Sequence, residues 1–188
     1  VYLSDLEGKI TKFNLTNMKW DSNDAKTRKK VELYDNTTLF WAGSTKTNGR
    51  YMYHSMDASI GEGKGKGQKT NTLWLFAGTG DYERIASRDK GTDNVLLGIK
   101  DENYPLFKDV DGVVEPTPAK DMTDITKCKN VTKDKTGASC PQKADAGWYV
   151  ALSDFKKVTA EPTVSRGLVY FPIYKPSSSV NRCSLGDA

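Results

Sequence analysis

The sequence contains one histidine and three cysteines in 188 residues. A catalytic Ser-His-Asp site would have to use His54, yet Ser55 is its immediate neighbour, and adjacent side chains on an extended chain point to opposite faces. Asp57 is also close in sequence, but no strand-turn-helix context for a nucleophile surrounds these residues. The sequence therefore argues against nucleophilic catalysis.

Long apolar runs are also missing, because none approaches the roughly 18 to 20 residues that cross a bilayer. The charge is not concentrated either: 28 Lys and Arg residues oppose 24 Asp and Glu residues, for a net charge of +4. The two basic clusters, residues 26–30 (KTRKK) and 61–69 (GEGKGKGQK), are typical of solvated loops. These features disfavour a membrane span and a nucleic-acid partner.

No window of about 12 residues shows a helical stripe. Short segments rich in β-branched and aromatic residues alternate with glycine-containing turns, which predicts an all-β fold. In the segment of residues 9–15, Ile10, Phe13 and Leu15 are candidate core residues. The predicted strands are residues 1–3, 9–15, 31–34, 73–77, 95–99, 148–152, 162–165 and 168–174.

The stretch LWLFAGTGDYE, residues 73–83, resembles the start of a dinucleotide-binding motif. Asp101 lies near the expected acidic position, but Glu83 replaces the third glycine of that motif. Residues 82–94 contain too few apolar side chains for a helix that covers a parallel sheet. We therefore expect one strand of a β-hairpin, in which Gly78 and Gly80 permit unusual backbone dihedrals at the strand exit.

Cys128 and Cys140 flank a polar, glycine-containing loop of the kind that a disulfide closes in an oxidising compartment. Closing such a short loop stabilises a fold by roughly 3 kcal/mol. Zinc is the alternative, although the cysteines and His54 are widely dispersed for the four ligands that zinc usually takes. Cys183 is then free or paired with a cysteine outside this chain.

Two groups of carboxylates are further candidates. Asp109, Asp111 and Glu115 in DVDGVVE suit either a calcium loop or an ordinary acidic turn, because the twelve-residue EF-hand pattern is absent. Asp81 and Glu83 are candidates for a glycosidase pair, but sequence spacing does not give their separation.

Aromatic residues suit either a core or a sugar-binding surface. Trp74 and Trp148 lie in apolar segments and are expected in the core. Trp20 and Trp41 remain open to both interpretations.

The first fifteen residues, VYLSDLEGKITKFNL, predict a tight hairpin closed at Gly8. The spacing of Tyr2, Asp5, Gly8 and Ile10 resembles propeller blades of the pyrroloquinoline-quinone repeat type, in which each hairpin needs neighbouring blades to bury its faces. A second, less complete occurrence of this hairpin pattern is VSRGLVYFPIY, residues 164–174. The fold expected is therefore β-propeller-like, with incomplete blades and long loops.

Four blocks occur in a recognisable order: YLSDLEGKITKFNL, then LWLFAGTGDYE with NVLLGIKD, then GWYVAL, and finally EPTVSRGLVYFPIYKP followed by CSLG. This order resembles the C-terminal β-propeller domain of the PilC/PilY family of type IV pilus tip-associated adhesins. The chain departs from the family at residues 155–157, where the family often has Gly-Glu, and at residues 171–174, where it often has Phe-Thr-Thr-Tyr. The Asp-rich calcium loop that often precedes the first block is not in this sequence.

The resemblance implies that residues 1–188 form part of a propeller, truncated at both ends or completed by another chain. It implies a non-enzymatic, extracellular protein of the bacterial surface that promotes pilus assembly, pilus extension and adhesion. Its partners would be pilins or minor pilins and a surface receptor, and calcium is the one candidate cofactor. The alternatives are an enzyme of the quinoprotein dehydrogenase type and a lectin-like, glycan-binding module.

Overall fold

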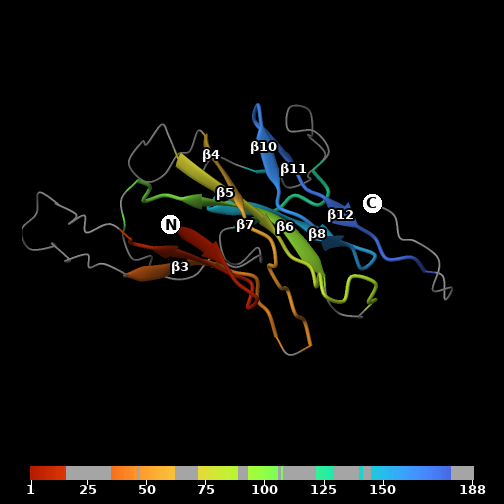
Figure 1. The fold of residues 1–188 in the computed structure, drawn as a ribbon. Coiled ribbons are helices and arrows are strands. Elements are labelled where there is room, and N and C mark those ends of the chain that lie inside the picture. Colours follow the sequence, from red (N-terminus) through yellow and green to blue (C-terminus); the bar gives the residue numbers. More distant parts are fainter. Residues whose placement is uncertain are drawn as a thin grey trace, which may run out of the picture.

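The computed structural model describes residues 1–15, 35–45, 47–61, 72–88, 93–105, 107, 122–128, 140–141 and 145–178. All regular structure in these ranges is β-strand, and the strands form several small sheets, none of which closes into a barrel (Figure 1). The all-β prediction is therefore confirmed. In the same ranges, no helix is long and apolar enough to span a membrane.

The first sheet is an antiparallel meander of three strands, β1 (Tyr2–Ser4), β2 (Lys9–Phe13) and β3 (Asn36–Trp41). Gly8 closes the β1–β2 turn with a φ of 74°, a conformation that favours glycine. A Cβ atom at this position would also lie 2.5 Å from the carbonyl oxygen of Arg50. The predicted hairpin is thus present, and its turn packs directly against the segment that follows β3.

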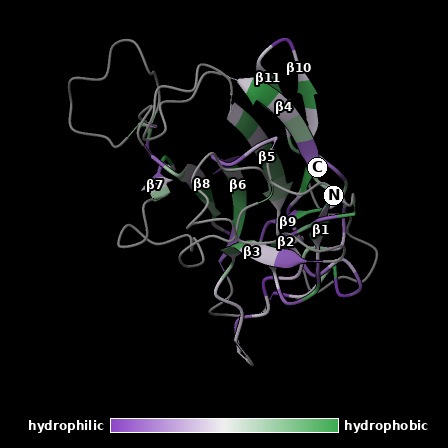
Figure 2. Cartoon of the chain, turned by 90° about the vertical axis from the view of Figure 1, so that its left-hand side faces the viewer, coloured by the Kyte–Doolittle hydropathy of each residue, from purple (hydrophilic) through white to green (hydrophobic). Residues whose placement is uncertain are grey.

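The second sheet has five strands in the order β4-β5-β6-β8-β7 (Figure 2). Its antiparallel part comprises β4 (Asp57–Gly61), β5 (Thr72–Gly78), β6 (Asn94–Asp101) and β8 (Gly147–Leu152). The short strand β7 (Met122–Asp124) pairs in parallel with β8 at one edge. The apolar strands β5 and β6 therefore lie inside the sheet, where both of their edges are hydrogen-bonded.

Two small antiparallel pairs complete the part of the fold that the structure describes. Strands β10 (Thr163–Ser165) and β11 (Leu168–Tyr170) form a hairpin, whereas β9 (Lys157–Val158) pairs with β12 (Ile173–Tyr174). Arg166 and Gly167 both have positive φ, as a type I′ hairpin turn requires. The single strand predicted for residues 168–174 is wrong, because the chain changes partner at Phe171 and Pro172.

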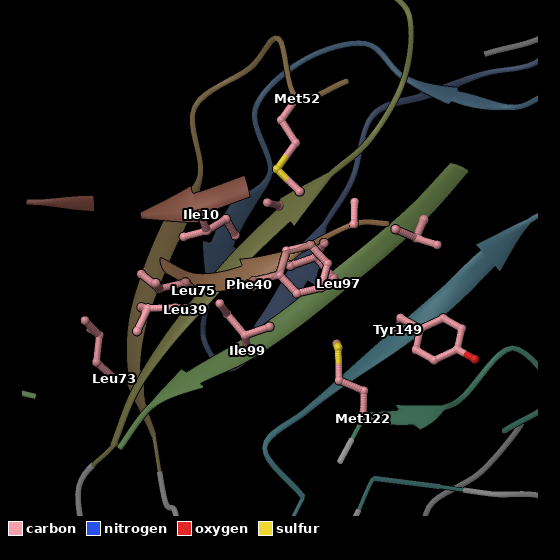
Figure 3. Packing of buried hydrophobic residues seen from close by; sticks show 13 residues of the cluster. Ile10, Leu39, Phe40, Met52, Leu73, Leu75, Leu97, Ile99, Met122 and Tyr149 are labelled. Carbon is pink, nitrogen blue, oxygen red and sulfur yellow. The ribbon is translucent and has the colours of Figure 1, made fainter. Parts of the chain in front are cut away.

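The main core lies between the two larger sheets (Figure 3). Residues Leu73, Leu75 and Ala77 of β5 alternate onto one face, which matches the period of two in a strand. Ile10 is fully buried, as predicted, but Phe13 is half-buried and Leu15 is exposed. The whole cluster comprises Ile10, Leu39, Phe40, Ala42, Met52, Leu73, Leu75, Ala77, Val95, Leu97, Ile99, Met122 and Tyr149.

The opposite face of the five-stranded sheet carries the two tryptophans expected in the core. Trp148 lies over Gly98, where a Cβ atom would come within 2.6 Å of the indole ring. Phe76, between the two tryptophans, has ring centroids 6.3 Å from Trp74 and 6.1 Å from Trp148. Both tryptophans are half-buried and lie outside the main cluster, so the expectation that they belong to that core is wrong.

A buried ion pair joins the two larger sheets. Lys12 shares the inner face of β2 with Ile10 and is only 6% exposed. Its ammonium group donates a hydrogen bond to Oδ2 of Asp101 at 2.5 Å, and Asp101, at the end of β6, is 2% exposed. Tyr2 faces Lys12 across the β1–β2 pair and donates its hydroxyl to the same oxygen at 2.5 Å. Because buried charges need partners, Asp101 fixes the position of the β1–β2 hairpin on the larger sheet.

We expect Lys12→Met to lower the free energy of unfolding by about 3 kcal/mol, because it leaves the Asp101 carboxylate buried without its cation. Lys12→Met combined with Asp101→Asn should lose less, since the substituted amide is uncharged and still accepts the Tyr2 hydrogen bond. Urea denaturation followed by circular dichroism measures both variants. The control is Lys9→Met, which removes a solvent-exposed ion pair with Glu7 and should cost much less than Lys12→Met. A double variant that loses as much as Lys12→Met alone would contradict this expectation.

The hydrogen bond between Tyr2 and Asp101 predicts a loss of stability at alkaline pH. Burial raises the pKa of Tyr2 far above its ordinary value of 10.0, and the hydrogen bond and negative charge of Asp101 raise it further. In the unfolded chain this tyrosine ionises near pH 10, while in the folded protein it stays protonated. Its stabilising contribution is therefore complete below about pH 10 and is lost as the pH rises above that value. In urea titrations between about pH 9 and 12, stability should fall less steeply for Tyr2→Phe than for the unchanged protein; equal slopes would contradict this.

Candidate binding surface

The Gly78-Thr79-Gly80 segment holds strand β9 against the end of β5. A Cβ atom on Gly78 would collide with the Val158 side chain, and one on Gly80 would lie 2.8 Å from Cβ of Lys157. Thr79 is fully buried and accepts a hydrogen bond on its carbonyl oxygen from Val158 N at 3.1 Å. Its hydroxyl oxygen accepts from Val95 N at 2.9 Å. The segment therefore makes a close contact between strands, and no helix follows it in the described residues.

This finding corrects one part of the sequence prediction. The predicted hairpin strand is present, since β5 pairs antiparallel with β6. Unusual dihedrals are not the reason for the glycines, because neither Gly78 nor Gly80 has a positive φ. Asp101, considered as a ribose ligand, instead pairs with Lys12.

We expect Gly78→Ala to lower the free energy of unfolding by roughly 1–3 kcal/mol, because the added methyl group overpacks the contact with Val158. Shortening the opposing side chain makes room for that methyl group. In a thermal or urea denaturation series, Gly78→Ala with Val158→Ala should therefore lose less than the sum of the two single losses. Strict additivity would show that the clash is relieved elsewhere.

Four aromatic rings gather where the loops after β3 and β5 meet. We call Tyr51, Tyr53, His54 and Tyr82 the tyrosine surface. Ring centroids lie 6.1 Å apart for Tyr51 and Tyr53, 6.5 Å for Tyr53 and Tyr82, and 5.1 Å for His54 and Tyr82. Tyr82 is 50% exposed, and the other three rings are half-buried. The rings thus form a continuous, partly exposed aromatic patch.

Backbone hydrogen bonds hold the segment that carries Tyr51 and Tyr53. Gly80 N donates to the carbonyl oxygen of Tyr51 at 2.9 Å, which ties this segment to the end of β5. Between the two tyrosines, Met52 points into the core and its N–H bonds the carbonyl oxygen of Asp5 at 3.3 Å. Tyr51 and Tyr53 therefore project away from the core on either side of a buried anchor.

The turn that carries Tyr82 is held by two cations. Arg84 Nε donates to Asp81 Oδ2 at 2.7 Å, and Arg84 N donates to Asp81 Oδ1 at 3.0 Å. The buried ammonium group of Lys157 donates to the carbonyl oxygens of Ile85 at 3.0 Å and Ser87 at 2.5 Å. Lys157 lies on β9, so this strand supports the turn directly.

Charges of both signs lie beside the rings. Burial raises the pKa of the Tyr53 hydroxyl, the negative charges of Glu83 and Asp81 raise it further, and Arg84 opposes them. Tyr53 is therefore a neutral hydroxyl at physiological pH. Glu83 is exposed, and its carboxylate forms no hydrogen bond or ion pair with any residue that the structure describes. The patch thus offers aromatic faces, a hydroxyl and an open carboxylate together.

The candidate catalytic residues do not form a triad in the described part of the chain. Ser55 Oγ donates to Glu161 Oε2 at 2.6 Å, and Asp57 accepts from Val164 N at 2.6 Å. Nε2 of His54 is buried and has no hydrogen-bond partner among the described residues. Of the proposed glycosidase pair, Asp81 is ion-paired with Arg84 while Glu83 is open to solvent.

Cys128 and Cys140, the two cysteines that the sequence pairs, form a disulfide with Cα atoms 5.2 Å apart. It ties the segment after the edge strand β7 to residues shortly before β8. Where the chain is described, no three metal-binding side chains gather into a cation site. Asp109, Asp111, Glu115, Cys183, Trp20 and the basic segments 26–30 and 62–69 lie outside the described residues.

The sequence analysis does not predict the tyrosine surface, although one signal for it exists. Tyr51, Met52 and Tyr53 alternate aromatic and aliphatic side chains, which indicates an extended segment with one inward and two outward side chains. The approach of Tyr82 has no such signal, because it depends on a contact across about thirty residues of sequence. Comparison of the chain with protein-family models, with characterised proteins and with solved structures finds no match.

Proposed function

We propose that this chain is a non-enzymatic, extracellular component of type IV pili, part of a β-propeller domain of the PilC/PilY kind. In this role it promotes pilus assembly and extension and attaches the pilus to surfaces. The observation that carries the proposal is the order of the four sequence blocks, each of which coincides with strands. They fall on β1–β2, on β5 and β6, on β8, and on β10 through β12.

The sheet topology supports the propeller part of the proposal. A propeller blade is a four-stranded antiparallel sheet that packs its face on the next blade. Strands β4, β5, β6 and β8 form such a four-stranded antiparallel array, and the β1-β2-β3 meander packs on one face of it. We interpret these as one blade and part of a neighbouring blade, with further strands supplied by the rest of a longer protein or by another chain.

Other features agree with this role. A disulfide between Cys128 and Cys140 suits an oxidising, extracellular location. Phe155 has a φ of 61°, a conformation that favours glycine, and the related family often has glycine in this segment. The partners in this proposal are pilins or minor pilins and a surface receptor, and calcium at Asp109, Asp111 and Glu115 remains part of it.

The test is immunogold electron microscopy of native cells with an antibody against this chain. Gold particles on filaments, at their ends or along their length, are expected, and they should disappear from cells that lack the major pilin. Gold confined to the cell interior would overturn the proposal. In that case, an absorption spectrum of the purified protein would show whether a bound quinone supports the dehydrogenase alternative.

A further inference from the structure

The tyrosine surface has the composition of a recognition site. Tyr and other aromatic side chains supply large contact areas at low cost in conformational entropy. Three of the four rings come from one loop, and Tyr82 joins them from another, so the patch exists only in the folded protein. Its most accessible ring, Tyr82, is half exposed although it contacts both Tyr53 and His54.

The surface is also fixed before any ligand arrives. Lys157 and the Asp81–Arg84 pair hold the turn beneath Tyr82, and Gly80 N holds the backbone of Tyr51. Ser55, next to His54, is hydrogen-bonded to Glu161 from a third segment. A site that is already ordered loses less conformational entropy on binding, which favours affinity.

The charges around the rings narrow the class of ligand. Asp81, Glu83 and Glu161 are negative, while Arg84 is positive and already paired with Asp81. Exposed carboxylates repel a polyanion such as nucleic acid or a sulfated glycan. Arg84 offsets part of this negative charge. The patch therefore lacks the concentrated negative potential that would favour a strongly basic partner. A neutral ligand with both apolar and hydroxyl-bearing faces fits this mixture best.

We infer that the tyrosine surface binds a neutral oligosaccharide. The C–H face of a sugar ring would stack on the exposed ring of Tyr82, and its hydroxyl groups would donate to the Glu83 carboxylate and bond the Tyr53 hydroxyl. This inference rests on the proposed adhesive function and names the chemical class of the surface to which the protein attaches.

The experiment uses the purified chain on an array of immobilised neutral oligosaccharides, with sialylated and sulfated oligosaccharides as charged controls. The chain should be retained by a subset of the neutral sugars. Tyr82→Ser and Glu83→Gln should each weaken that binding by about tenfold or more, as expected for central contact residues. Tyr170→Ser is the matched control, because Tyr170 is 56% exposed on β11 and should be dispensable.

Three outcomes would overturn the inference: retention by charged sugars alone, retention by no sugar, or equal binding by Tyr82→Ser and Tyr170→Ser. Circular dichroism of each variant shows whether it is folded, so a loss of binding is not confused with unfolding. The proposed function is tested separately by the location of the protein on filaments. Filament labelling without neutral-sugar binding would reject only the ligand class, and sugar binding without filament labelling would reject only the pilus role.

Discussion

The placement of the two larger sheets depends on one buried carboxylate. Asp101 is bound by the ammonium group of Lys12 and the hydroxyl of Tyr2; Lys12 and Asp101 are almost fully buried, and Tyr2 is half-buried. Apolar side chains between the sheets tolerate small shifts, because hydrophobic attraction has no preferred direction. The hydrogen-bonded ion pair, by contrast, has a preferred direction. It therefore fixes the position of the β1–β2 hairpin on the five-stranded sheet, and the hydrogen bond from Met52 N to the carbonyl oxygen of Asp5 connects this hairpin to the loop that carries Tyr51 and Tyr53.

Asp101 pairs with Leu73 near the start of β5, and a second constraint acts at the other end of this strand. Gly78 and Gly80 allow β9 to approach so closely that Thr79 accepts a hydrogen bond from Val158 of β9 while it exchanges hydrogen bonds with Val95 of β6. This contact brings Lys157 beneath the turn that carries Tyr82. The glycine segment therefore acts on both halves of the tyrosine surface, since Gly80 N also binds the carbonyl oxygen of Tyr51, whereas the Asp101 pair acts only on the half that carries Tyr51 and Tyr53.

The sequence reveals the strands whose apolar alternation is strong, such as β5, β6 and β8. It does not reveal β4 or β9, because these short strands have few apolar residues and exist through pairing with distant segments. Hydropathy alone favours Phe13 over Lys12 as a core residue. The burial of Lys12 follows only once Asp101 faces it from 89 positions away. Of the tyrosine surface, the alternation at residues 51–53 is visible in the sequence, whereas the approach of Tyr82 is not.

The Tyr2 contact has a mechanical consequence. Strand β1 lies at the edge of its sheet and pairs only with β2 among the described strands, in the antiparallel order Tyr2 with Lys12 through Ser4 with Ile10. A force that peels β1 from its N-terminal end loads these pairs one after another and not all at once. Here Tyr2, which follows the hydrogen-bonded Val1–Phe13 pair at this end, is also attached through Asp101 to the other sheet. Once the Val1–Phe13 pair has opened, tension therefore reaches the five-stranded sheet before the remaining pairs of the hairpin can separate.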